Sequence, residues 1–349
     1  MDRSTQRNSL ELLANTLKPI SALMLDAGVQ EIMVNGPDNI WVERGGRIER
    51  YEAKISEIQI RSAISVLARL ERKEAKEGTK DGIIDSRMDG MRVAGVLSPT
   101  AVNGHAIAIR KHSPVHLSLE DYAEAGAFRP ARASGLDRGA AGGAERPADE
   151  AVTAGGEALK AFLRWMVKAR KNAVVAGGTS SGKTTFLNAL IAEFDPGDRV
   201  ITIEDTPELK IKVPNRVSLE SNEQAGVTTR DLVRLALRFR PDRLIVGEVR
   251  GGEAYDLMQA ANTGHEGCLA TVHANSAVAA LSRLETLVLS SGTEWPHSAV
   301  QAEIARTFQF VVFMSRREKV RVLEEVVEIA GFNRQTSEYG LKHIYRRSA

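Results

Sequence analysis

The chain has 349 residues, of which 43% are hydrophobic and 26% are charged, which is enough for two domains with buried cores. The net charge of +2 gives no general electrostatic reason to expect nucleic acid or an anionic membrane as the main partner. The single cysteine, Cys268, excludes an internal disulfide and favours a reducing compartment. No apolar run reaches the roughly 18–20 residues that span a bilayer, and the beginning of the chain lacks a signal-peptide core. We therefore expect a cytoplasmic protein, with peripheral attachment to a membrane complex left open.

Residues 1–122 are predicted to form the smaller of two domains, an α+β domain of the PAS-like kind. Residues 32–51 alternate apolar and polar side chains around Asn-Gly and Gly-Gly pairs, which is typical of a meander of short strands. Residues 58–77 have helical periodicity. Residues 90–112 are typical of two strands joined by an Asn-Gly turn.

Residues 123–157 differ in composition from the rest of the chain. Alanine, glycine and arginine dominate this segment, and large apolar side chains are almost absent. Such a segment cannot bury enough surface to offset the entropy lost on ordering. The composition therefore predicts a flexible linker over 123–157.

Helix and strand signals alternate in the second domain, which is predicted over 158–349. The expected elements are helix 158–170, strand 172–176, helix 184–194, strand 199–204, helix 228–239, strand 243–249, helix 252–262 and strand 267–274. This alternation predicts an α/β domain with a mostly parallel sheet covered by helices.

A glycine-rich loop between strand 172–176 and helix 184–194 fits the pattern G-x-x-x-x-G-K-[ST]. Small residues let backbone N–H groups approach phosphates, and the helix N-terminus favours negative charge. Lys183 is expected to reach the β- and γ-phosphates, and the Thr184 hydroxyl is expected to ligate Mg²⁺. The predicted nucleotide-binding residues are Gly177, Gly178, Thr179, Ser180, Ser181, Gly182, Lys183, Thr184 and Thr185.

Ser180 occupies a position in this loop where glycine can be used. If the backbone has a positive φ there, a serine costs roughly 1 kcal/mol. If φ is negative, the hydroxyl can instead hold the shape of the loop.

Polar residues also stand at the ends of three further predicted strands: Glu204, Glu248 and His273. Parallel strands present their carboxyl ends at one edge of a sheet, where ligands bind, so these side chains are expected to converge on the loop. Glu248 is predicted to polarise the attacking water or to hold Mg²⁺ through water. Glu204 is predicted to be a second group that orients water or the Mg²⁺ shell, and His273 is predicted to contact the γ-phosphate.

Each of these three side chains has a structural alternative. Glu248 can cap the turn that follows it, Glu204 can be a surface carboxylate before a turn, and His273 can be a satisfied structural histidine. His265, Cys268 and His273 together suggest zinc, but their spacing fits no common zinc pattern.

The four motifs resemble those of a known family. Residues 177–185, 202–209, 238–254 and 262–275 are similar to the Walker A, Asp box, Walker B and His box of the secretion traffic ATPases. The resemblance is strongest to the VirB-type ATPases of type IV secretion, and within them to the TrbB-type conjugal-transfer branch, where a strand pair follows the core. It implies a P-loop, RecA-like ATPase domain that binds ATP and Mg²⁺.

The resemblance also implies an assembly. Family members form homo-hexameric rings with ATP between the two domains, and hydrolysis moves one domain against the other. This movement drives pilus assembly or substrate export together with inner-membrane components of a secretion or conjugation apparatus. Basic residues of the N-terminal domain reach the phosphates, and Arg92 and Arg110 match them by position, with a solvated strand face as the alternative.

Two features depart from the wider family. The linker over 123–157 is long for it. Related pilus-assembly and type II secretion ATPases carry a tetracysteine metal site, which a chain with one cysteine cannot form. The cysteine count therefore argues against that branch.

Arg230, Arg234 and Arg238 recur every four residues on one face of a predicted helix. They are expected to form a subunit interface, to meet an acidic neighbour, or to be solvated. No aromatic residues interleave for base stacking, so sequence-specific nucleic-acid binding is not expected. A P-loop kinase or similar transferase remains an alternative, as does a DNA-translocating motor, although the neutral net charge argues against the motor.

Overall fold

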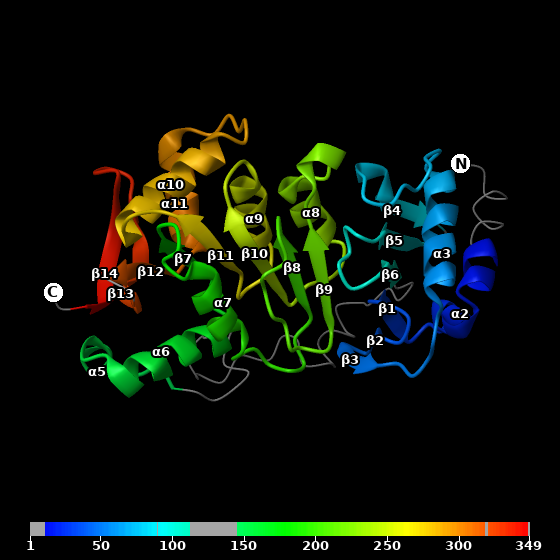
Figure 1. The fold of residues 1–349 in the computed structure, drawn as a ribbon, viewed down its shortest axis with the longest axis horizontal. Helices are drawn as coiled ribbons and strands as arrows, with labels where there is room; N and C mark the ends of the chain where they lie inside the picture. Colours follow the sequence, from blue (N-terminus) through cyan, green and yellow to red (C-terminus); the bar gives the residue numbers. More distant parts are fainter. Residues whose placement is uncertain (1–10, 89, 112–144, 318–319, 348–349) are drawn as a thin grey trace, which may run out of the picture.

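The computed structural model describes residues 11–88, 90–111, 145–317 and 320–347. These residues form two sheets, one in each half of the chain, arranged along the long axis of the molecule (Figure 1). Most of the predicted linker, residues 123–144, lies outside the described residues.

The N-terminal half is an antiparallel sheet with helices on one face. After a helical stretch at 11–16, its elements are η1 (Lys18–Ile20), α2 (Ser21–Leu25), β1 (Val29–Val34), β2 (Ile40–Arg44), β3 (Arg47–Arg50), α3 (Glu57–Leu70), η2 (Lys80–Gly82), β4 (Ile83–Met88), β5 (Met91–Val96) and β6 (Ala106–Lys111). The strand order is β3-β2-β1-β6-β5-β4. The expected meander β1–β3 and the α+β class are confirmed.

The helix α3 begins with a capping box, because the Ser56 side chain accepts from the Gln59 N–H and the Gln59 side chain accepts from the Ser56 N–H. Ile60, Ile64 and Leu67 lie on one face of α3 and are fully buried against the sheet. This amphipathic pattern is the reason that the periodicity over 58–77 predicts a helix, although the helix ends at Leu70.

The C-terminal half carries the second sheet. Its elements are α5 (Asp149–Thr153), α6 (Gly156–Lys168), β7 (Ala173–Gly177), α7 (Lys183–Ile191), β8 (Val200–Glu204), β9 (Arg216–Glu220), η3 (Glu223–Ala225), α8 (Thr229–Ala236), β10 (Arg243–Val249), α9 (Glu253–Asn262), β11 (Leu269–His273), α10 (Ala277–Leu289), α11 (His297–Thr307), β12 (Phe310–Arg317), β13 (Val320–Asn333) and β14 (Glu338–Arg346).

This sheet is mostly parallel, as predicted. The strand order is β14-β13-β12-β7-β11-β10-β8-β9, with parallel pairing from β12 to β9 and antiparallel pairing among β12, β13 and β14. The expected strand pair after the core is thus a run of three strands. The edge strand β9 has no counterpart in the predicted elements.

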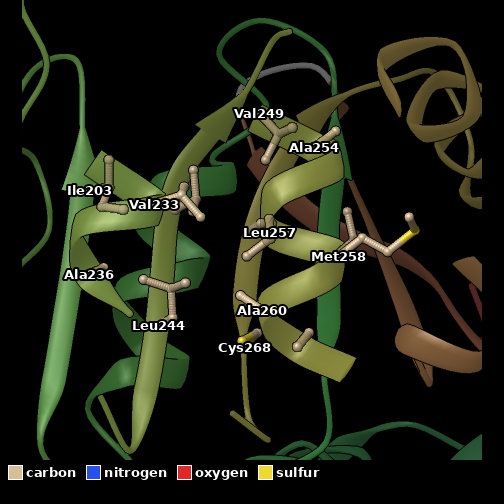
Figure 2. Close-up of a cluster of buried hydrophobic side chains, with 14 of the residues drawn as sticks. Ile203, Val233, Ala236, Leu244, Val249, Ala254, Leu257, Met258, Ala260 and Cys268 are labelled. Atoms are coloured by element: carbon tan, nitrogen blue, oxygen red, sulfur yellow. The ribbon is translucent and has the colours of Figure 1, made fainter. Parts of the chain in front are cut away.

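Helices cover both faces of the parallel sheet, and their apolar faces form its two cores. Figure 2 shows Val233 of α8 and Leu257 of α9 among the side chains of one core, beside Ile203 of β8 and Leu244 of β10. The buried strands are continuous apolar runs, as parallel strands covered on both faces require.

The last part of the predicted linker is folded onto the C-terminal domain. Residues 149–153 form α5, which packs on β14, and Val152 is fully buried in the core beside Phe162. The Arg146 guanidinium binds the Glu328 carboxylate at 2.7 Å. The domain boundaries at 122 and 158 stay predictions.

The N-terminal domain docks on the edge strand β9 and on α8. The loop between β5 and β6 forms backbone hydrogen bonds with β9, from Val102 N–H to the Ser218 carbonyl and from Glu220 N–H to the Thr100 carbonyl. Residues 90–112 therefore contain two strands as expected, but a nine-residue loop, not a tight Asn-Gly turn, joins them. The loop is long because it also pairs with the second domain.

A buried polar network completes this contact. The fully buried Arg199 guanidinium donates to the Phe239 carbonyl and to the side-chain oxygens of Asn35 and Asn215. Asn35 directly follows β1, Arg199 directly precedes β8, and Phe239 lies shortly after α8. The Arg199 guanidinium therefore joins the N-terminal sheet to the start of β8 and the end of α8. The two domains thus meet through directional hydrogen bonds as well as through apolar contacts.

None of the helices within the described residues is both long enough and apolar enough to cross a membrane.

The buried ion pair between Asp198 and Arg243 generates a prediction about stability. Both side chains are almost fully buried, at 3% and 2% exposure, and their atoms Oδ2 and Nε lie 2.5 Å apart. Asp198→Ala leaves the Arg243 guanidinium buried without its counter-charge, so we expect the free energy of unfolding to fall by about 3–5 kcal/mol. Urea unfolding followed by circular dichroism measures the change.

The matched control is Glu157→Ala, which removes a carboxylate from an exposed ion pair with Lys160 in the same domain. This pair is solvated, so its loss is expected to cost less than about 1 kcal/mol. Equal losses for the two variants would show that the buried pair does not stabilise the domain.

Candidate nucleotide site

The phosphate-loop sequence forms a tight connection between β7 and α7. A Cβ at Gly177 would stand 2.6 Å from the Met314 carbonyl oxygen of β12, so only glycine fits there. Gly182 has φ +92°, a conformation that suits glycine, and α7 begins at the next residue, Lys183. The loop therefore presents a helix N-terminus at the carboxyl end of β7, as an anion site requires.

Ser180 adopts φ +61°, the left-handed conformation that disfavours residues with a Cβ. The side chain is exposed. Of the two alternatives for this position, the structure therefore shows the strained backbone. Strain at a loop tip is found where surrounding structure holds the residue in place, as at ligand-binding loops.

Lys183 points back over the loop. Its Nζ donates to the Gly178 carbonyl at 3.1 Å. Partial burial lowers the pKa of Lys183, and the opposing attraction comes from the Glu248 carboxylate of β10. Lys183 and Glu248 thus share one electrostatic environment, as the predicted convergence of the strand ends requires.

Glu248 is tied to Arg250, a residue that directly follows β10. The Glu248 Oε2 atom lies 2.5 Å from Arg250 Nη2, and Asp205 Oδ2 at the end of β8 lies 2.5 Å from Arg250 Nη1. The hydrogen bond to Glu248 raises the pKa of Arg250. One exposed guanidinium therefore joins the carboxylates that end two neighbouring strands.

Glu204 is 95% buried and serves the turn after β8. Its Oε1 atom accepts from the backbone N–H groups of Glu208 and Leu209, at 2.9 and 3.0 Å. Burial raises the pKa of Glu204. Glu204 therefore holds the turn that follows it, as its structural alternative states, but its carboxylate is buried and not at the surface. The exposed carboxylate at this strand end is that of Asp205.

His273 ends β11 beside the beginning of the loop. It is the register partner of Gly177, and its side chain is exposed. His265 and Cys268 have other roles: His265 Nδ1 lies 3.0 Å from the Pro241 carbonyl, and the Cys268 thiol donates to the His265 carbonyl. Burial raises the pKa of Cys268 to about 12, so the thiol stays protonated. Within the described residues no cluster suited to a metal ion is found.

A polar cleft of about 930 Å³ opens at this edge of the sheet. Its lining includes Glu204, Asp205, Glu248, Arg250 and Glu253. The Glu253 carboxylate accepts from the N–H groups of Arg250 and Gly251 at the beginning of α9, which holds the turn after β10 in place. None of the lining residues belongs to the phosphate loop 177–185, so the cleft is the acidic side of the site, on the side of β8 and β10.

The donor set fits a nucleotide phosphate with Mg²⁺. Thr184 lies in the first turn of α7, and the Ser181 hydroxyl of the loop is buried with no hydrogen-bond partner among the described residues. An orphaned hydroxyl in a phosphate loop is a group that a ligand can satisfy. The carboxylates across the cleft are hard oxygen ligands of the kind that Mg²⁺ prefers, directly or through water.

Arg92 and Arg110 lie elsewhere. They are register partners on β5 and β6, and they line a cavity of about 170 Å³ together with Glu31, Arg238 and Arg240. Arg92 binds Asp85 through two hydrogen bonds, at 3.0 and 2.8 Å. The N-terminal domain docks at β9, and four strand spacings, or about 19 Å, separate β9 from β7. Within one chain these arginines are not brought to the loop (Figure 1).

The arginine face of α8 makes contacts within the chain. Arg230 and Arg234 both bind the nearly buried Asp256 of α9, at 2.5 and 2.7 Å. Arg238 binds Asp85 of the N-terminal domain at 3.2 Å. The helical spacing of these arginines thus reflects packing on α9 and on the docked domain.

Sequence reasoning did not assign Arg250 or Asp205 to the site, although both flank predicted site residues. The available signal was their position, because each directly follows a strand whose last carboxylate was singled out. An arginine between two acidic strand ends is a natural counter-ion for them.

Comparisons with known proteins agree with this geometry. Residues 150–327 match the family model described as "Type II/IV secretion system protein". The chain is 32% identical to the conjugal transfer protein TrbB of Rhizobium radiobacter, over 91% of this chain and 88% of that protein. It is 33% identical to the type IV secretion system protein VirB11 of Bartonella quintana, over 81% of this chain and 83% of that protein.

A solved structure has the same fold over both domains. The VirB11 ATPase from the Brucella suis type IV secretion system, in complex with sulphate, matches with a TM-score of 0.81 and 29% identity, over 93% of this chain and 96% of that one. The phosphate loop, the carboxylates at the strand ends, and these similarities over both domains lead to one assignment. The chain belongs to the type II/IV secretion family and is a type IV secretion ATPase of the VirB11/TrbB type.

Proposed function

We propose that the chain hydrolyses Mg²⁺-ATP at residues 177–185 and uses the energy for pilus assembly or substrate transfer in a type IV secretion or conjugation apparatus. The observation that carries the proposal is the convergence of Lys183, Glu248, Arg250 and His273 on one edge of the parallel sheet. The family membership supports the apparatus, and with it an inner-membrane site of action on the cytoplasmic face.

The residues have separable roles in this proposal. The backbone of the loop and Lys183 bind the phosphates, while Thr184 and the carboxylates hold Mg²⁺, which supplies charge neutralisation when bound. Glu248 orients and polarises the attacking water, and the ion pair with Arg250 holds its carboxylate at the cleft. His273 contacts the γ-phosphate, and Glu204 supports the turn that places Asp205.

The assembly in the proposal is a ring, which we take to be a homo-hexamer. Arg92 and Arg110 lie on the domain that docks at β9, which is about 19 Å across the sheet from β7, so in a ring they reach the phosphates of a neighbouring subunit. Both arginines stand on the sheet of the N-terminal domain, which docks at the edge strand β9, and this placement supports action between subunits.

The first prediction concerns hydrolysis. Glu248→Gln is expected to bind ATP with nearly unchanged affinity and to lower kcat by about 100-fold or more, because it removes the base but keeps the shape. Lys183→Ala is expected to lose ATP affinity, since it removes the cation that pairs with the phosphates. Phosphate release without any acceptor, together with calorimetric ATP binding, measures both effects.

The same assay separates this proposal from a kinase or other transferase. Phosphate that is released only after an acceptor is added would contradict the ATPase. Loss of ATP binding in Glu248→Gln would contradict the role given to that carboxylate.

The second prediction concerns Ser180. Ser180→Gly removes the strain of the left-handed backbone, which stabilises the loop conformation by about 1–2 kcal/mol. The greater chain entropy of glycine opposes this by about 0.5–1 kcal/mol. We expect ATP affinity that is unchanged or tighter by up to about fivefold, because the bound loop needs the same positive φ. Ser180→Ala is the control, since it removes the hydroxyl and keeps the strain. Clearly weaker binding in both variants would show that the hydroxyl holds the loop.

The third prediction concerns the ring. Arg110→Ala and Lys183→Ala are each expected to be inactive, but an equal mixture regains up to about a quarter of the activity if the arginine acts on a neighbour. Lys183→Ala mixed with Glu248→Gln is the control, because both residues belong to one site and cannot complement. Light scattering after size exclusion, with and without ATP, measures assembly. A monomer under all conditions would contradict the ring.

A further inference from the structure

The hairpin of β12 and β13 runs past the phosphate loop. Strand β12 pairs in parallel with β7, with Met314 opposite Gly177, and continues to Arg317 beyond the point where β7 ends. The returning strand β13 places Arg321 opposite Arg316 in the antiparallel ladder. Basic side chains of this hairpin therefore stand at the same sheet edge as the loop, although no predicted motif included them.

Arg321 lies against the loop itself. Its Nη1 atom donates to Thr185 Oγ1 at 3.1 Å. A Cβ at Gly182 would stand 2.6 Å from the Arg321 Cδ atom, so the arginine stem rests on the last glycine of the loop. Among the described residues, no carboxylate lies within 4.0 Å of the Arg321 guanidinium. The group makes one hydrogen bond to a neutral hydroxyl and has five N–H donors.

The position of Arg321 relative to Glu248 decides which part of a nucleotide it can meet. In the strand order, β12 lies on one side of β7, while β11, β10 and β8 lie on the other. Glu248, the proposed water-orienting residue, ends β10 on that second side, so the γ-phosphate end is directed there. The backbone of a phosphate loop cradles the α- and β-phosphates, and its lysine reaches the β- and γ-phosphates. The nucleoside end therefore lies on the side of β12 and β13.

We propose that Arg321 is a nucleotide-binding residue that donates to the α-phosphate of ATP. The inference rests on the proposed function, in which residues 177–185 hold the phosphates. The Arg321 guanidinium already donates to the Thr185 hydroxyl in the first turn of α7. When ATP is bound, it can exchange this hydroxyl for the α-phosphate oxygens with little movement. The C-terminal hairpin thereby contributes to the site, which would otherwise be built from β7, β8, β10 and β11.

An α-phosphate contact has a distinct kinetic signature. The α-phosphate is present in ATP and ADP and does not react, so the contact contributes equally to the ground state and the transition state. Arg321→Ala is expected to weaken ATP and ADP by the same factor, about tenfold or more for a charge-assisted hydrogen bond. It raises KM by a similar factor and leaves kcat within about twofold.

The matched control is Arg317→Ala. Arg317 stands on the same hairpin and carries the same charge, but it pairs with Glu324 at 2.6 Å and, among the described residues, makes no hydrogen bond to the loop. Its loss is expected to leave ATP and ADP affinity unchanged. Arg321→Lys keeps the charge without the planar fork, so partial recovery of affinity separates charge from hydrogen-bond geometry. Thermal melting of each variant verifies folding.

The decisive probe is the pair of ATPαS diastereomers, in which sulfur replaces one or the other non-bridging α-oxygen. The full-length protein is expected to bind the two diastereomers with different affinity, and Arg321→Ala is expected to remove most of that difference. Calorimetry measures both. Unchanged discrimination, unchanged ADP affinity, or a fall in kcat without a change in KM would each overturn the proposal.

Lys183→Ala distinguishes failure of this inference from failure of the proposed function. If Lys183→Ala loses ATP binding while Arg321→Ala binds normally, the loop is the site and only the role of Arg321 is wrong. If Lys183→Ala binds ATP as the unaltered protein does, the phosphates do not sit in the loop, and the proposed function fails with it.

Discussion

Parallel pairing of β7, β11, β10 and β8 is the constraint on which the site depends. Because neighbouring parallel strands end at the same edge, residues as distant in sequence as Lys183 and His273 come to one edge of the sheet. Each strand needs only a polar residue at or just beyond its end, while its interior stays apolar for both cores. The carboxylates of Asp205 and Glu248 then meet, and Arg250 offsets their repulsion.

Arginine has a second, purely structural use in this chain. Arg199 directly precedes β8 and Arg243 begins β10, so both are buried at the amino ends of strands, whereas Arg250 is exposed at a carboxyl end. Arg199 donates to the Phe239 carbonyl and to Asn35 of the N-terminal domain, whereas Arg243 binds the Asp198 carboxylate within the C-terminal domain. Burial thus distinguishes arginines that hold the fold together from the exposed arginine at the candidate site.

Much of the fold and part of the site follow from local patterns. The strand–helix alternation and the meander are local in sequence, so the short strands over 32–51 and the strand–loop–helix connection around 177–185 are predicted correctly. The β9 edge strand, the long loop after β5 and the partners of Arg230 and Arg234 depend on contacts between distant segments, which periodicity does not encode. For the same reason, the loop contact of Arg321 could not be foreseen. The roles of the candidate site residues stay predictions.

Strand β10 lies between the candidate site and the contact with the N-terminal domain. It begins at Arg243, shortly after Arg240, whose guanidinium binds the Glu43 carboxylate of the N-terminal domain. It carries Glu248 about 17 Å further along. The ladder with β8 ends at Val246, and the ladder with β11 is irregular between Val246 and Val249, so Glu248 stands where the pairing is interrupted. A small shift of the Glu248 backbone therefore breaks no register pair with β8, while Arg243–Val246 stay anchored in the sheet beside the contact with the N-terminal domain.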